Sequence, residues 1–98
     1  MMFGRERFDL AGEEFLRIVQ EELARKGRPA TPDDAAAVLG LSPNTMWEWL
    51  DQRERGWLDE LVSRWNAQAE PNGFTPVLLV DHGDEVELFI GLFHPAPA

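Results

Sequence analysis

Two helix-start signals on either side of one glycine constrain the fold of this chain more than any other feature. They lie in the segment TPDDAAAVLGLSPNTMWEWL, where Thr31-Pro32 and Ser42-Pro43 flank Gly40. A hydroxyl side chain before proline starts a helix, because the hydroxyl accepts a backbone N–H and proline has no N–H to satisfy. Glycine readily adopts the left-handed backbone that a tight turn requires. The segment therefore predicts two short helices joined by a turn.

Apolar periodicity predicts further elements on both sides of this segment. Phe15, Val19 and Leu23 recur at helical spacing, and so do Trp57, Leu61 and Trp65, so each set indicates an amphipathic helix. Beyond Gly73 the period changes to two: Val86, Leu88, Ile90 and Leu92 alternate with other residues and should face the helices. We expect helices at about 9–26, 32–39, 43–55 and 57–70, and strands at about 75–80 and 85–93.

The predicted fold class is mainly α, of the α+β type, within a single domain that covers residues 1–98. It consists of four helices followed by a C-terminal two-stranded antiparallel β-hairpin. A chain of 98 residues with four Trp and six Phe has enough apolar volume for a core. The acidic turn DHGDE between the strands indicates that the hairpin covers the core or forms an edge for a protein partner.

The charge and the residue usage restrict the function. Nine Lys and Arg against eighteen Asp and Glu give a net charge of −9, which predicts weak non-specific affinity for DNA. The chain has no Cys, so disulfides, thiolate metal sites and Cys nucleophiles are excluded, and a reducing cytoplasm is expected. The start of the chain has no signal-peptide pattern, and no apolar run is long enough for a membrane span. We expect a cytoplasmic protein without a membrane partner.

The stretch AAVLGLSPNTMWEWL resembles the helix-turn-helix of excisionases, MerR-type regulators and phage small terminase or repressor proteins. Ala36 stands where the two helices cross closely, Gly40 and Leu41 form the turn, and Met46 and Trp49 point back into the core. The resemblance covers residues 31–50 only. It implies that the second helix would enter the major groove of DNA.

The resemblance also implies a set of contact residues. The DNA-facing positions are Ser42, Asn44, Thr45, Trp47, Glu48, Asp51 and Gln52, and the candidates for phosphate contact are Arg28, Arg53 and Arg55. Asn44 and Gln52 could pair with adenine edges, and Glu48 could accept from cytosine. The chain departs from these families at Glu48, where they commonly carry Arg or Lys, and no residue from Ser42 to Gln52 is basic.

Two functions follow from these features. The motif favours a DNA-binding transcriptional regulator of bacterial or phage origin that acts as a homodimer. The acidic charge favours the alternative, a protein-binding module or inhibitor that uses the same helices on a nucleic-acid-handling protein. Small phage-encoded inhibitors such as anti-CRISPR proteins are similar in type, being short, acidic and aromatic-rich, and the acids could imitate a phosphate backbone.

Other candidate residues have structural explanations. Trp47 either anchors an interface or packs beneath the hairpin, whereas Trp49, Trp57 and Trp65 fall on core-facing positions. Asp81, His82 and Asp84 fit the backbone chemistry of a turn better than a metal site. The sequence shows no phosphate loop, nucleophile elbow or metal-ligand spacing, so we predict neither an enzyme nor a metal or cofactor.

Overall fold

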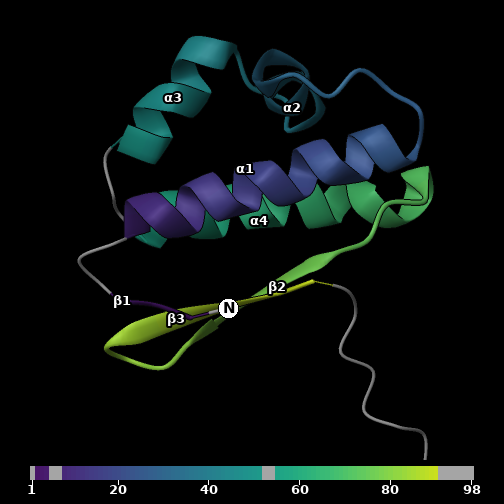
Figure 1. Cartoon of the computed structure of the whole chain (residues 1–98). Coiled ribbons are helices and arrows are strands. Elements are labelled where there is room, and N and C mark those ends of the chain that lie inside the picture. The colour runs from purple at the N-terminus through teal and green to yellow at the C-terminus, as the bar shows by residue number, and fades with distance from the viewer. Residues whose placement is uncertain (1, 5–7, 52–54, 91–98) are drawn as a thin grey trace, which may run out of the picture.

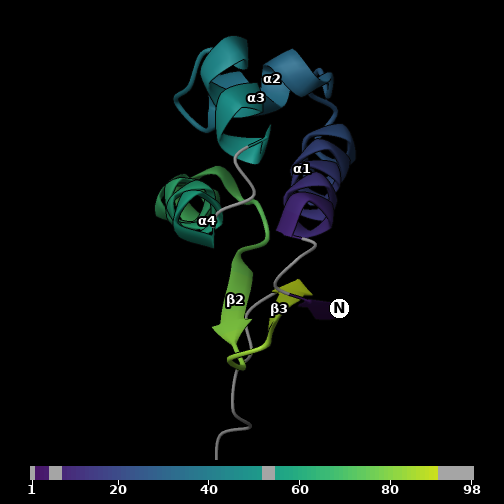
Figure 2. The same cartoon turned by 90° about the vertical axis from the view of Figure 1, so that its left-hand side faces the viewer.

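The chain folds into three layers, as the computed structural model shows (Figure 1, Figure 2). The structure describes residues 2–4, 8–51 and 55–90. The middle layer contains two long helices, one face of which is covered by two short helices and the other by a small sheet. The elements are β1 (Met2–Gly4), α1 (Phe8–Arg25), α2 (Pro32–Val38), α3 (Pro43–Asp51), α4 (Arg55–Ala69), the short 3₁₀ helix η2 (Glu70–Asn72), β2 (Val77–Asp81) and β3 (Glu85–Ile90).

α1 forms because its apolar residues recur on one face, and that face is buried against the rest of the molecule. Phe15, Val19 and Leu23 are all buried in the core. The helix ends where Gly27 adopts a positive φ of 70° and the N–H of Arg28 donates to the carbonyl of Leu23 at 2.9 Å. This pairing satisfies a carbonyl that the helix leaves without an internal donor.

α2 starts at the first of the two predicted signals. The side chain of Thr31 accepts the N–H of Asp34 at 3.2 Å, and the carboxylate of Asp34 accepts the N–H of Thr31 at 3.0 Å. This reciprocal capping box satisfies two backbone donors at once. The Thr31 hydroxyl also donates to Asp34, and these hydrogen bonds lower the pKa of the Asp34 carboxyl below its ordinary value.

The turn after α2 and the start of α3 also use local hydrogen bonds. Gly40 has a φ of 75°, and the N–H of Leu41 donates back to the carbonyl of Ala36 at 3.0 Å. The side chain of Ser42 then accepts the N–H of Thr45 at 3.2 Å and caps α3. Residues 32–51 therefore form two helices with a turn between them. The α3 residues predicted beyond Asp51 include 52–54, which lie outside the described residues, and α4 already begins at Arg55 instead of residue 57.

The sheet has three strands in the order β1-β3-β2, with antiparallel pairing throughout. The prediction of a two-stranded hairpin was wrong in this respect, although the mainly helical α+β class is correct. β1 contains three residues, which is too short for an alternating pattern to show. Its partner also lies at the far end of the chain, since Phe3 pairs with Val86.

β2 begins at Val77, two residues later than predicted. The backbone of Thr75 binds side chains of α1 and α4 and not a neighbouring strand. Its N–H donates to Glu22 at 2.5 Å, and its carbonyl accepts from Trp65 at 2.9 Å. Pro76 then has no N–H to offer to a neighbouring strand. The described part of β3 ends at Ile90, so the predicted strand residues 91–93, with Leu92, lie outside the described residues.

The inner face of the sheet packs on α1 and α4. Val77, Val86 and Leu88 are buried there, as the alternation predicted for β3. Ile90, which was predicted to face the helices as well, is 59% exposed. Ile90 is the last described residue of β3, where the strand pairs with β2 only.

Candidate functional site

Four side chains of α3 form one continuous surface that points away from the core. Asn44, Trp47, Glu48 and Asp51 are separated by three or four residues, the spacing at which helical side chains become neighbours. They line a hollow of about 420 Å³, and all four are exposed. We call these four residues the α3 face. The opposite side of the helix is anchored by Met46, which is completely buried.

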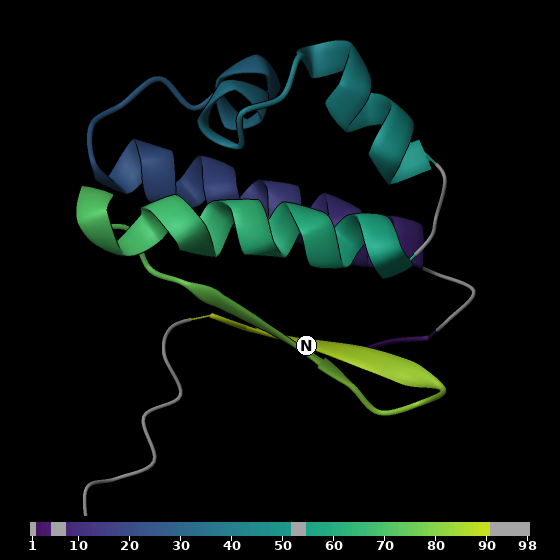
Figure 3. The same ribbon diagram turned by 180° about the vertical axis from the view of Figure 1, so that it is seen from behind.

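Trp47 is the dominant side chain of the α3 face. It is 45% exposed, although an indole ring is among the largest apolar groups that a core could bury. α3 lies on the opposite side of the α1–α4 layer from the sheet (Figure 1, Figure 3). The hairpin therefore does not cover Trp47, and the interpretation that placed this residue beneath the hairpin is wrong.

Ser42 and Thr45 are occupied by the start of α3. The Ser42 hydroxyl accepts the Thr45 N–H and donates to the Thr45 hydroxyl at 2.9 Å. Both residues were predicted to contact a ligand, but these hydrogen bonds keep their side chains at the helix cap. Gln52 lies outside the described residues.

In the part of the chain that the structure describes, the arginines predicted to contact phosphate are not gathered beside the α3 face. The guanidinium carbon of Arg28 lies 5.3 Å from the ring centre of Phe74, which follows the C-terminal end of α4. α3 leads into the other end of α4, a helix of 15 residues that is about 22 Å long. Arg53 lies outside the described residues. Arg55 begins α4, and its side chain is likewise outside the description.

Arg64 of α4 holds the α2–α3 turn in place, a role that the sequence did not reveal. Its guanidinium donates to the carbonyl of Leu39 at 3.3 Å, lies 5.4 Å from the ring centre of Trp49, and donates to Glu60 at 3.1 Å. One side chain thus joins the end of α2, the inner side of α3 and the surface of α4. The sequence pattern places Arg64 on a helix, but it does not show which residues Arg64 contacts.

Two of the tryptophans assigned to the core line an open pocket instead. Trp49 and Trp57 stack with ring centres 4.6 Å apart, and both are half-buried. With Gly56, Glu60 and Arg64 they surround a pocket of about 520 Å³ between α3 and α4. Trp65 is completely buried, as predicted. The core assignment was therefore correct for Trp65 and only partly correct for the stacked pair.

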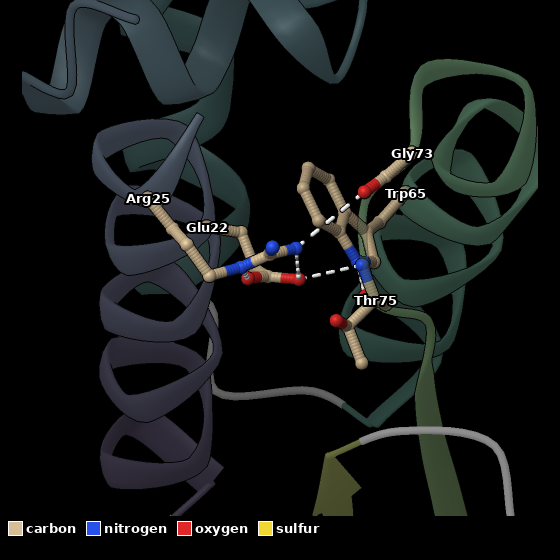
Figure 4. Close-up of polar contacts among 5 residues, drawn as sticks. All are labelled: Glu22, Arg25, Trp65, Gly73 and Thr75. Carbon is tan, nitrogen blue, oxygen red and sulfur yellow. Dashed lines mark hydrogen bonds and ion pairs between the residues drawn. The ribbon is translucent and has the colours of Figure 1, made fainter. Parts of the chain in front are cut away.

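A buried carboxylate joins α1 to the segment that leads into β2 (Figure 4). Glu22 accepts from Arg25 at 2.6 Å and from the Thr75 N–H at 2.5 Å. Arg25 also donates to the carbonyl of Gly73 at 3.4 Å. The hydrogen bonds from Arg25 first, and then from Thr75, lower the pKa of Glu22 to about 2 against the opposing effect of burial. Because all partners are within the chain, this network is structural.

The turn between β2 and β3 contains the acids and the histidine considered as metal ligands. Gly83 has a φ of 90°, and its N–H donates to the Asp81 carboxylate at 2.8 Å, as expected for turn chemistry. His82 Nε2 lies 2.9 Å from Glu87 Oε1. Within residues 2–4, 8–51 and 55–90, no group of three His, Asp or Glu side chains could hold a metal ion. None of the helices in these ranges is long and apolar enough to cross a membrane.

Comparisons of the chain with protein-family models, with curated proteins and with solved structures found no match. The resemblance to helix-turn-helix families therefore depends on residues 31–50 alone.

Proposed function

We propose that this chain is a protein-binding module that contacts its partner through the α3 face. The observation that carries the proposal is the position of Trp47, which is 45% exposed in a hollow among polar side chains. Tryptophan is enriched among the residues that dominate binding energy at protein interfaces, because its large ring loses contact with water on binding. A polar rim around such a residue is the usual composition of an interface.

The charge of the α3 face supports a protein partner over DNA. Glu48 and Asp51 line the same hollow as Trp47, and DNA binding would bring both carboxylates towards phosphates. Proteins normally use Lys and Arg to hold the phosphate backbone, and those contacts set the register of the recognition helix. From Pro43 to Asp51, α3 has no basic residue.

A second candidate function is the DNA-binding regulator, and the arrangement of α2 and α3 favours it. The two helices meet at a tight turn, and the exposed Asn44 could form a bidentate pair with adenine. A homodimer would be needed so that two weak half-sites combine. Arg53 and Arg55 would then have to supply the phosphate contacts.

One pair of measurements separates the two functions. Quantitative affinity capture would compare the wild type with Trp47→Ala, with Leu78→Ala as the matched control. Leu78 is similarly exposed, at 43%, but belongs to the sheet on the other side of the molecule. The proposal expects a captured protein that Trp47→Ala loses and Leu78→Ala retains.

Selection from random DNA duplexes at low salt is the second measurement. An enriched site whose binding falls with Asn44→Ala or Arg53→Ala would support the regulator. If in addition Trp47→Ala captured the same proteins as the wild type, the protein-binding proposal would be overturned.

A further inference from the structure

We propose that the α3 face binds an arginine side chain on a basic segment of its protein partner. This inference rests on the proposed function and specifies the chemistry of the partner. It is carried by the geometry of Trp47, Glu48 and Asp51, and by an arrangement of the same groups elsewhere in this molecule.

The spacing of the residues creates a site for a flat cation. Trp47 and Asp51 are separated by four residues and Glu48 and Asp51 by three, so the Asp51 carboxylate lies next to both the indole and the Glu48 side chain on the helix surface. The hollow that they share with Asn44 measures about 420 Å³. A guanidinium group could stack on the indole while its N–H groups point towards the carboxylates.

The carboxylates of the α3 face lack the partners that acids elsewhere in the molecule have. Glu14, Glu22 and Glu60 each form an ion pair with an arginine of their own helix. In the described part of the chain, neither Glu48 nor Asp51 forms a hydrogen bond or an ion pair. The α3 face therefore presents two acceptors that no described side chain pairs with.

The molecule already contains the proposed combination once, between α3 and α4. There the guanidinium of Arg64 lies 5.4 Å from the ring centre of Trp49, while its Nε donates to Glu60 at 3.1 Å. The outer side of α3 offers the same two groups, an indole and a carboxylate, without the arginine. The partner would supply the missing guanidinium.

Arginine fits this face better than other occupants do. Lysine is a compact charge that is strongly hydrated, whereas guanidinium is planar, less hydrated and able to bind carboxylates with two N–H groups. A second copy of the chain would place Glu48 and Asp51 against their own equivalents in a symmetric interface, and like charges would oppose association. The net charge of −9 would instead attract a basic partner over a distance.

The test is an NMR titration of the ¹⁵N-labelled chain with a peptide of alternating Gly and Arg. A peptide of alternating Gly and Lys at the same charge is the first control. We expect the indole N–H signal of Trp47, assigned with Trp47→Phe, to shift with the arginine peptide and to shift much less with the lysine peptide. The other indole signals report whether the variants stay folded.

Charge variants separate local recognition from general attraction. Glu48→Gln with Asp51→Asn should weaken the binding at least about tenfold, the factor that corresponds to roughly 1.4 kcal/mol. Glu70→Gln with Glu85→Gln removes the same charge from exposed positions in η2 and in β3, and should change the affinity little. Equal weakening by both pairs, equal binding of the lysine peptide, or no shift of Trp47 would each overturn the inference.

Failure of this inference is distinguishable from failure of the proposed function. If Trp47→Ala abolishes protein capture while the arginine peptide leaves the Trp47 signal unchanged, the protein-binding module stands and the arginine assignment falls. If capture is insensitive to Trp47→Ala, the proposed function falls, and with it the partner assigned here.

Discussion

Glu22 accepts the backbone N–H of Thr75 at 2.5 Å, so a carboxylate in α1 holds the first residues of the segment that leads into the sheet. Arg25 reinforces this contact by binding Glu22 at 2.6 Å and the carbonyl of Gly73 at 3.4 Å. The carbonyl of Thr75 accepts from the indole of Trp65. The connection between the helical layer and the sheet therefore depends on a charged group that is almost completely covered (Figure 4).

The first prediction concerns the pH dependence of stability. Because the pKa of Glu22 falls from 4.5 to about 2 on folding, the ionised form stabilises the folded state. That stabilisation is fully present above about pH 4.5 and is lost as the pH falls towards 2. The shift corresponds to at most about 3–4 kcal/mol, and solvent around the half-exposed Arg25 should reduce it to about 1–2 kcal/mol.

Urea unfolding of the wild type and of Glu22→Gln between about pH 2 and pH 7 measures this effect. The difference in the free energy of unfolding should be largest at neutral pH and should shrink below about pH 4.5. Glu21→Gln is the control, because Glu21 is exposed and pairs only with Arg17 on the same helix. A pH-independent difference for Glu22→Gln would show that its carboxylate does not carry the stabilisation.

The second prediction concerns Arg64 as the residue that holds the α2–α3 turn. Arg64→Met keeps the apolar stem but removes the donors to Leu39 and Glu60 and the charge beside Trp49. We expect a loss of about 1–2 kcal/mol in the free energy of unfolding, because the partly buried Leu39 carbonyl loses its donor. The near-ultraviolet circular dichroism of the stacked Trp49 and Trp57 should also change. Arg17→Met, at an exposed position on α1, should leave both measurements unchanged.

The third prediction tests the backbone of the turn. Gly40 has a φ of 75°, where an L-residue with a Cβ is strained, so Gly40→Ala should cost about 1–2 kcal/mol. Gly56→Ala is the matched control: Gly56 is the second residue of α4, a methyl group added to its Cα would meet nothing within 4 Å beyond its chain neighbours and the backbone of its own helix, and the variant should gain up to about 1 kcal/mol of helix stability. Thermal unfolding of the two variants should move the midpoint in opposite directions, and equal shifts would contradict this account of the turn.

The parts of the fold that could be predicted from the sequence depend on contacts within a few residues. The cap at Thr31, the turn at Gly40 and the cap at Ser42 each act over three to five residues, so the starts of α2 and α3 and the turn between them were visible in the sequence. The four members of the α3 face could be grouped for the same reason, because helical spacing alone places them together.

The parts that could not be predicted depend on contacts between distant segments. β1 exists because Phe3 meets Val86, and no pattern within three residues announces that pairing. Glu22 stands next to the exposed Glu21, and its backbone partner Thr75 lies 53 residues further along the chain. The exposure of Trp47 likewise depends on which side of the helical layer the sheet occupies. No local sequence pattern determines that side.

The last prediction concerns the open edge of β2. The side-chain amide of Asn66 donates to the carbonyl of Val77 at 2.6 Å and accepts its N–H at 2.9 Å, as a neighbouring strand would. Since alternate residues of an antiparallel strand point their polar groups to the same side, those of Leu79 also point to this edge. Asn66 therefore blocks one end of an edge that could pair with another chain.

Asn66→Ala should cost about 1 kcal/mol and increase self-association, measured by sedimentation velocity across a range of concentrations. Asn72→Ala removes an exposed amide that binds only Gln68 and should leave the sedimentation unchanged. An Asn66→Ala protein that stays monomeric at every concentration would show that the edge is protected by other means.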